Sequence, residues 1–311
     1  MNYEPVVGEN LPSQSGHAYI DAFLQSLDIR ASSKYTYKRQ LKEYIIWQTK
    51  LNIVTPSRED ILRYKEYLQE NRALSALTIG GYLTAVRRFF EWLEAEKIYP
   101  NIARGVKGPK RRKGFKKDAL TLEQAKTLLK SIDKSSLTGK RDFAILNLML
   151  RTGLRTIEII RATKEDITRQ SGEIVLFIQG KGRDSKDDFV VLTESTIEPI
   201  RIYMNERGKL KDNDPIFASH STKNFGKKLT TRSISRIVKN RLRAININDD
   251  RLTAHSLRHS AITFSLLAGA TTQEARLLAR HTDINTTLIY AHNINRIKEA
   301  PEHKIEDFFK D

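Results

Sequence analysis

Residues 141–158 read RDFAILNLMLRTGLRTIE, and this stretch decides the architecture of the second half of the chain. Residues 141–151 are nearly all apolar after the first two, which predicts a helix buried on every side. Arg155 lies just beyond Gly153, at the end of that helix. A cation there is costly unless an anion meets it. Glu158 could be that anion, so an internal salt bridge and a site for an external anion are both open.

The residues around this stretch predict a mainly helical domain with a small antiparallel β-sheet, an α+β fold, over residues 118–311. Thr121 can cap a helix that runs through Lys130. The β-type runs 173–179 and 188–192 flank a basic, glycine-containing loop at residues 180–184, which indicates a hairpin. Helical patterns resume near Glu194 and continue to the end.

Residues 17–103 predict a separate, all-helical domain. Four helical patterns follow one another: 18–27, 33–49, one that begins after Ser57, and one that Thr78 opens. Ser57 and Asp60 resemble a capping box, with Asp in place of the preferred Glu. Nothing in this part indicates a strand, and residues 1–16 are expected to be a flexible tail.

The segment 104–117, RGVKGPKRRKGFKK, separates the two domains. It has eight basic residues, no acidic ones, three glycines and a proline. Such a composition is typical of an extended linker that binds phosphates, although a solvated connector without contacts is the alternative. The candidate DNA-binding residues in it are Lys107, Lys110, Arg111, Arg112, Lys113, Lys116 and Lys117.

The composition favours a nucleic-acid partner. A formal net charge of +17 over 311 residues calls for a polyanion, and nucleic acid is the usual one. A membrane is disfavoured, because no apolar run reaches about 18 residues and residues 1–16 have no signal pattern. We therefore expect a cytoplasmic protein. The absence of cysteine excludes disulfides, thiolate catalysis and cysteine-ligated zinc.

Residues 255–259, HSLRH, carry a second group of polar side chains. On a helix His255, Arg258 and His259 share one face. The two histidines could bind zinc in a metal-dependent nuclease, but the glutamate of an HExxH site is absent and Arg258 would repel a cation. We favour an anion site, because an arginine fork suits phosphate. His259 is taken as a packing or hydrogen-bonding residue.

Residues 278–292 hold a third group. Thr282 or Asp283 can cap a short helix that starts after His281, with Tyr290 near its end. Taken alone, Tyr290 is more typical of a core or interface tyrosine.

Together these segments resemble the tyrosine recombinase, or phage integrase, family, and especially its Xer-like branch. The family pattern is an Arg in a TGLR-x-x-E segment, a Lys in a β-hairpin, H-x-x-R, a His, and a Tyr nine residues later. Five separated elements match in the same order: Arg155, Lys181, His255 with Arg258, His281 and Tyr290.

The resemblance implies a helical core-binding domain followed by a catalytic domain that cuts and rejoins DNA through a 3′-phosphotyrosine. Tyr290 would be the nucleophile, His255 the proton acceptor and Lys181 the general acid for the leaving 5′ hydroxyl. Arg155, Arg258 and His281 would stabilise the phosphate, with Glu158 supporting them. The family works as a tetramer on two double-stranded DNA sites and needs neither metal nor cofactor.

Two departures from the family pattern stand out. Arg280 occupies the position before His281 where the family often has glycine, which could alter packing or add a phosphate contact. The hairpin loop also carries Arg183 and Lys186, and Arg183 is a further DNA-binding candidate. A type IB topoisomerase and a catalytically silent DNA-binding regulator are the alternatives. The reaction suits mobile-element integration or excision and chromosome dimer resolution alike.

Overall fold

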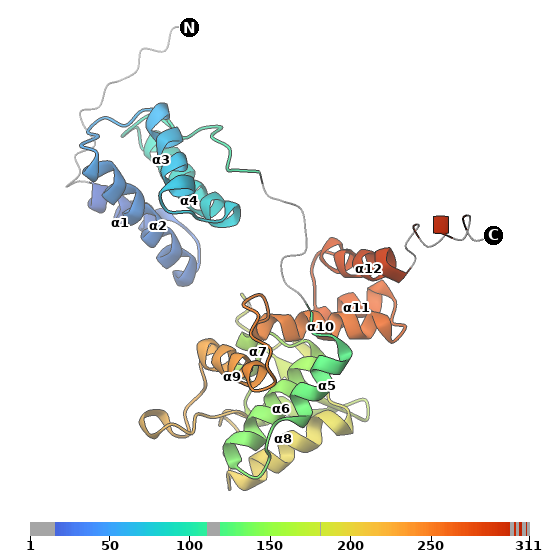
Figure 1. Cartoon of the computed structure of the whole chain (residues 1–311). Coiled ribbons are helices and arrows are strands. Elements are labelled where there is room, and N and C mark those ends of the chain that lie inside the picture. Colours follow the sequence, from blue (N-terminus) through green and yellow to red (C-terminus); the bar gives the residue numbers. More distant parts are fainter. Residues whose placement is uncertain are drawn as a thin grey trace. The chain divides into compact units, whose positions relative to one another are not determined.

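The computed structural model describes residues 16–110, 119–180 and 182–298, together with residues 302, 305, 306 and 309. The chain divides into two compact units, Met1–Gly114 and Phe115–Asp311 (Figure 1). Most of the structure is helical, with one three-stranded antiparallel sheet in the second unit. The predicted fold class, mainly α with a small antiparallel sheet, is confirmed.

Four helices build the first unit, and aromatic side chains fill its core. They are α1 (Gly16–Ser26), α2 (Ala31–Lys50), α3 (Arg58–Glu70) and α4 (Ala76–Ala95). Tyr44 of α2 packs edge-on against Tyr64 of α3, with ring centroids 5.0 Å apart, and against Phe90 of α4 at 6.0 Å. Because all three rings are buried, they join α2, α3 and α4 through one shared contact.

Local hydrogen bonds fix where these helices begin. The backbone N–H of Ser57 donates to the Asp60 carboxylate at 2.9 Å, so the predicted capping box of α3 is present. Helix α4 starts earlier than expected, since Ser75 is its cap and accepts from the N–H of Thr78. Thr78 is therefore the third residue of α4 rather than its cap.

The second unit contains the sheet and the remaining helices of the described chain. The helices before the sheet are α5 (Leu122–Lys130), α6 (Leu137–Thr152), α7 (Thr156–Arg161) and the short 3-10 turn η1 (Lys164–Asp166). The strands are β1 (Ile167–Gln170), β2 (Glu173–Ile178) and β3 (Asp188–Val191). The elements after the sheet are α8 (Glu194–Glu206), η2 (Thr222–Asn224), α9 (Thr231–Arg243), α10 (Ala254–Leu267), α11 (Thr272–Ala279) and α12 (Asn285–Lys298).

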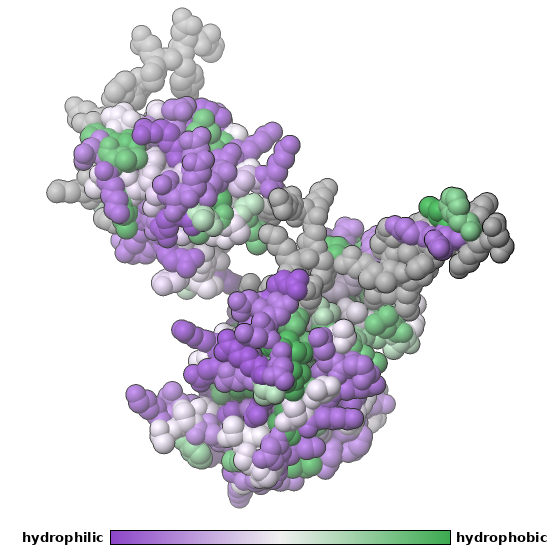
Figure 2. All heavy atoms as spheres, in the orientation of Figure 1, coloured by the Kyte–Doolittle hydropathy of each residue, from purple (hydrophilic) through white to green (hydrophobic). Residues whose placement is uncertain are grey.

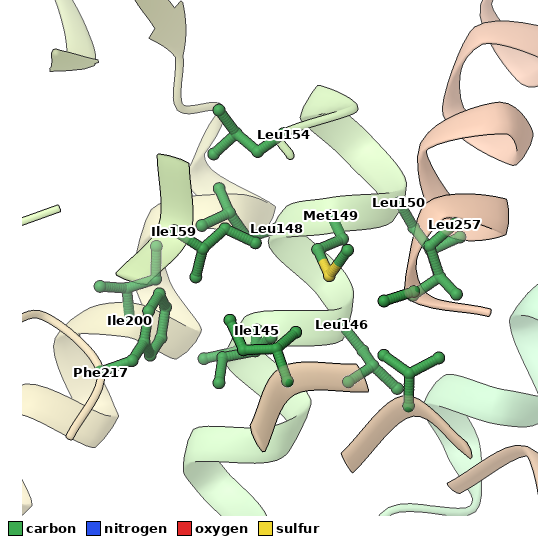
Figure 3. Close-up of a cluster of buried hydrophobic side chains, with 14 of the residues drawn as sticks. Ile145, Leu146, Leu148, Met149, Leu150, Leu154, Ile159, Ile200, Phe217 and Leu257 are labelled. Atoms are coloured by element: carbon green, nitrogen blue, oxygen red, sulfur yellow. The ribbon is translucent and has the colours of Figure 1, made fainter. Parts of the chain in front are cut away.

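Helix α6 is the central element of this unit, as its apolar sequence predicts. Ile145, Leu146, Leu148 and Met149 are fully buried. Figure 3 shows them among side chains from other elements, including Ile159 of α7, Ile200 of α8 and Leu257 of α10. The end of α6 is thereby held rigidly, and this end leads directly to Arg155.

The sheet has one strand more than the sequence suggested. Strand β1 pairs with β2 through a two-residue connection, Ser171 and Gly172, whose φ angles are 51° and 87°. Two positive φ angles are typical of a type I′ hairpin turn, which glycine favours. Strand β1 is short and largely exposed, so it lacks the hydrophobic alternation that identified β2 and β3.

Helices α10, α11 and α12 pack together at the C-terminal side of this unit (Figure 1). Their contact surface is a small apolar cluster separate from the main core, which we call the Tyr290 cluster: Ile262, Ala275, Ala279 and Tyr290, with Leu266 at its edge. Helix α12 is longer than the short helix that was expected. Tyr290 is consequently the sixth of its 14 residues and not near its end.

The surface of the first unit is mainly hydrophilic on the face that Figure 2 shows. Among the described residues, no helix combines the length and the apolar character needed to cross a membrane.

Candidate active site

Arg155 is positioned by the turn that ends α6. Gly153 adopts a left-handed conformation with φ 62°, which glycine tolerates better than other residues, and Arg155 becomes the N-cap of α7. Its backbone N–H donates to Glu158 Oε2 at 2.7 Å, and its Nη1 donates to Glu158 Oε1 at 2.8 Å. The internal salt bridge that the sequence left open is therefore formed, while the Arg155 side chain keeps 28% of its surface exposed.

Arg280 reaches the same carboxylate from the end of α11. Its Nη2 lies 3.2 Å from Glu158 Oε2, and its Nη1 donates to the backbone oxygen of Leu278 at 2.8 Å. Burial would raise the pKa of Glu158, but the charge of Arg280 and the hydrogen bonds from Arg155 hold it below its ordinary value. The buried carboxylate is thus ionised and joins two arginines that are 125 positions apart in the sequence.

Arg258 lies beside this pair and is almost completely buried. Its Nη1 donates to the backbone oxygen of Gly153 at 2.6 Å, and its Nη2 donates to the backbone oxygen of Ala279. Burial, together with the positive charges of Arg155 and Arg280, lowers its pKa to about 9, so it remains a cation at neutral pH. Two guanidinium groups therefore contact the carboxylate of Glu158 and a third lies near them, so the three arginines carry two positive charges in excess of that carboxylate.

Tyr290 lies against the histidines of α10. Its hydroxyl and Nδ1 of His259 form a hydrogen bond, and the two ring centroids are 5.4 Å apart. The His259 ring in turn contacts the ring of His255 edge-on at 4.6 Å. Burial raises the pKa of Tyr290 to about 12, although the charge of Arg258 opposes this shift. The phenol is therefore protonated at neutral pH and needs an acceptor before it can act as a nucleophile.

His281 completes the group from the connection between α11 and α12. Its ring stacks near Tyr290 with a centroid distance of 6.4 Å, and its Nδ1 lies 2.9 Å from the hydroxyl of Thr287. Burial and the nearby arginines, Arg258 first, lower its pKa to about 4. His281 is therefore neutral at neutral pH, and it can take part in hydrogen bonds without adding charge.

The hairpin loop between β2 and β3 supplies the lysine candidate, Lys181, which lies outside the described residues. The two other basic residues of the loop are engaged in ion pairs. Lys186 Nζ lies 2.6 Å from Asp166 Oδ1, and Arg183 Nη1 lies 2.9 Å from Asp187 Oδ2. Because Lys186 is held by a buried carboxylate, Lys181 remains the preferred candidate for the general acid.

The linker candidates fall partly outside the described residues. Lys107 and Lys110 are exposed on the segment that follows α4. The positions not described are Arg111, Arg112, Lys113, Lys116 and Lys117. Within residues 16–110, 119–180 and 182–298, no three His, Cys, Asp or Glu side chains gather in a way that would suit a metal ion.

Sequence reasoning missed two residues of this site. His259 was taken as a packing or hydrogen-bonding residue outside the site, and its hydrogen bond is made to the hydroxyl of Tyr290. Arg280 was noted only as a departure, whereas it pairs with Glu158. The sequence did hold a signal for Arg280. Glu158 of the TGLR-x-x-E segment and an arginine in a position where the family often has glycine are opposite charges that each need a partner.

We expect Arg280→Gly to slow DNA cleavage by about tenfold to a hundredfold. Arg280 has a φ of 53°, so glycine would relieve backbone strain of about 1 kcal/mol or more. The guanidinium that fixes Glu158, and through it Arg155, would nevertheless be lost, and a charge-assisted hydrogen bond contributes about 1.5–3 kcal/mol. Single-turnover cleavage of a labelled duplex measures the effect, with thermal unfolding as the stability control.

Arg280→Lys is the matched variant, since it keeps a charge near Glu158 without the planar fork. It should fall between the wild type and Arg280→Gly. Wild-type cleavage by Arg280→Gly would show that Arg280 has no positioning role.

Two family models match this chain. Residues 118–296 match the phage integrase family, and residues 20–97 match the phage integrase N-terminal SAM-like domain. Tyrosine recombinase XerD of Halalkalibacterium halodurans is 31% identical over 268 residues, covering 83% of this chain and 85% of the relative. Tyrosine recombinase XerC of Chlamydia muridarum is 31% identical over 242 residues, covering 75% and 74%.

Solved structures agree on the fold. XerH site-specific recombinase bound to a palindromic difH substrate superimposes with a TM-score of 0.74 at 20% identity, covering 96% of this chain and 99% of that one. The Tn1549 transposon integrase in complex with transposon right end DNA has a TM-score of 0.69 at 17% identity, covering 88% and 92%. The chain therefore belongs to the phage integrase family, as a tyrosine recombinase of the Xer-like branch, a site-specific enzyme that breaks and rejoins DNA.

Proposed function

We propose that this recombinase cuts DNA by moving a backbone phosphate from a 5′ oxygen to the hydroxyl of Tyr290, which gives a 3′-phosphotyrosine. The observation that carries the proposal is the position of Tyr290 next to the excess positive charge. Arg258 is the neighbour of His259 on α10, and His259 contacts the Tyr290 hydroxyl, so the charge of Arg258 opposes the rise in the pKa of Tyr290. The charge of Arg155 in turn lowers the pKa of Arg258. A phosphodiester bound by these arginines would therefore meet the phenol.

Arg155 and Arg258 would bind the non-bridging oxygens of that phosphate. Negative charge on these oxygens grows in the transition state, and donors held in place beforehand stabilise it without reorganisation. Both guanidinium groups are fixed, Arg155 by Glu158 and Arg258 by the backbone oxygen of Gly153. His255, exposed on the first turn of α10, and His281 would add further hydrogen-bond donors.

Lys181 would protonate the 5′ oxygen as it leaves. The phosphate ester with Tyr290 keeps the energy of the broken bond, so a 5′ hydroxyl of another strand can reverse the step without ATP. The basic residues of the linker, Lys107 and Lys110 among them, and Arg183 would hold the flanking phosphates, an electrostatic contribution that makes binding salt-dependent. The substrate would be double-stranded DNA with specific recombination sites, in the cytoplasm.

We further propose that four copies assemble on two such sites, since exchange between two duplexes requires four strand cuts. The same reaction serves integration or excision of a mobile element and resolution of joined chromosomes. The DNA that flanks the gene would separate these roles, because inverted repeats beside mobile cargo favour the first.

Covalent capture tests the proposed function. A library of nicked duplexes with a randomised centre is incubated with the protein in excess EDTA, and DNA that stays attached under denaturing conditions is sequenced. We expect one site with inverted arms to be enriched, and two labelled duplexes that carry it to exchange strands. Relaxation of any supercoiled plasmid without exchange between duplexes would instead indicate a topoisomerase.

A further inference from the structure

We propose that His259 is a catalytic residue of this recombinase, which removes the proton from the Tyr290 hydroxyl as the oxygen attacks the phosphate. The inference rests on the proposed role of Tyr290 as the nucleophile. It assigns the proton transfer to His259, which the sequence indicated as a packing or hydrogen-bonding residue, in place of His255.

The position of the two side chains carries this inference. His259 is on α10 and Tyr290 on α12, two helices that pack against each other. Their hydrogen bond joins Nδ1 of the imidazole to the phenol oxygen, the atom that would become bonded to phosphorus. A proton acceptor must lie within hydrogen-bond reach of the proton that it removes, and His259 meets this requirement before any DNA is bound.

The surroundings of Tyr290 make such an acceptor necessary. Only 5% of the Tyr290 surface is exposed, so bulk water has little access to the phenol. The neighbouring rings have other contacts: Nδ1 of His281 is bonded to Thr287, and the exposed ring of His255 packs edge-on against His259. His255 is thus exposed where it can meet the incoming phosphate, while the ring of His259 contacts both His255 and Tyr290.

Each proton that moves in this step has a donor and an acceptor. The Tyr290 O–H bond breaks and its proton moves to Nδ1 of His259, the phenol oxygen bonds to phosphorus, and the bond from phosphorus to the 5′ oxygen breaks. That oxygen takes a proton from Lys181. His259 must begin as the neutral ring with its proton on Nε2. In the rejoining step the imidazolium returns its proton to the departing phenol oxygen.

Two substitutions distinguish proton transfer by His259 from a hydrogen bond that only positions Tyr290. Asparagine places an amide atom where Nδ1 stands, so His259→Asn can keep the hydrogen bond to Tyr290 but cannot take up a proton. Glutamine is longer and carries its amide near the position of Nε2, so His259→Gln serves as a second variant if the first fails to fold. His255→Asn is the matched control one turn earlier on the same face of α10.

The experiment measures single-turnover cleavage of a nicked duplex by each variant, with either tyrosine or fluorotyrosine at position 290. We expect His259→Asn to bind DNA normally and to cleave about 10²- to 10⁴-fold more slowly, the usual contribution of a general base. Fluorotyrosine has a more acidic phenol and depends less on a base. It should therefore recover at least tenfold of the rate in His259→Asn while changing the wild-type rate little.

Three results would overturn the inference. Wild-type cleavage by His259→Asn would mean that a hydrogen bond alone suffices at this position. Slow cleavage without recovery by fluorotyrosine would indicate a structural role. Recovery in His255→Asn, and not in His259→Asn, would return the proton transfer to His255. Covalent adducts that persist in Tyr290→Phe would instead contradict the proposed function itself, so the two failures are distinguishable.

Discussion

Tyr290→Phe should abolish covalent attachment to DNA while DNA binding is retained. The substitution removes only the hydroxyl, and the ring can still fill the Tyr290 cluster against Ile262, Ala275 and Ala279. The hydrogen bond to His259 would be lost, which costs about 1 kcal/mol of stability and leaves the fold intact. Without the phenol oxygen no phosphate ester can form, so we expect the yield of adduct to fall to background on denaturing gels.

Tyr35→Phe is the matched control, because Tyr35 is 71% exposed and lies in the first unit. It should form adducts like the wild type. An adduct of unchanged yield in Tyr290→Phe would mean that another side chain attacks the phosphate.

Lys181→Ala should slow cleavage of ordinary DNA by about 10²- to 10⁴-fold, since it removes the proton donor for the 5′ oxygen. A substrate with sulfur in place of that oxygen has a leaving group that needs no proton. On this substrate the variant should cleave nearly as fast as the wild type. Parallel single-turnover assays on the two substrates give the ratio.

Lys186→Ala is the control for this experiment. Lys186 bonds to the buried carboxylate of Asp166 and to the hydroxyl of Thr163, so its loss should destabilise the base of the hairpin. Any slower cleavage by this variant should be the same on both substrates. An equal loss on both substrates for Lys181→Ala would contradict the general-acid role.

The sequence predicted those features that depend on contacts between residues close together in the chain. The buried helix before Gly153, the capping box of Ser57 with Asp60 and the cap at Thr121 follow from residues within one or two turns of each other. The ion pair between Arg155 and Glu158 belongs to the same class, since three residues separate the partners. Helical periodicity also predicted the mainly helical fold.

Contacts between distant elements could not be predicted in this way. The bond from His259 to Tyr290 depends on how α12 packs against α10, and the pair of Arg280 and Glu158 depends on how α11 meets the end of α6. Strand β1 was missed for a different reason. The strand has four residues, and the three after Ile167 are polar, so only the turn at Ser171 and Gly172 distinguished it from a loop.

The proposed nucleophile and the arginines proposed to bind the phosphate are held in place by different contacts. Arg155 is anchored by Glu158, and Arg258 by the backbone oxygens of Gly153 and Ala279, whereas the ring of Tyr290 is held by the small apolar Tyr290 cluster. Loosening those few side chains would withdraw the phenol and leave the rest of the catalytic unit folded. A substitution that disturbs the packing of Ala275 would then yield a protein that still binds its target duplex but cleaves it slowly.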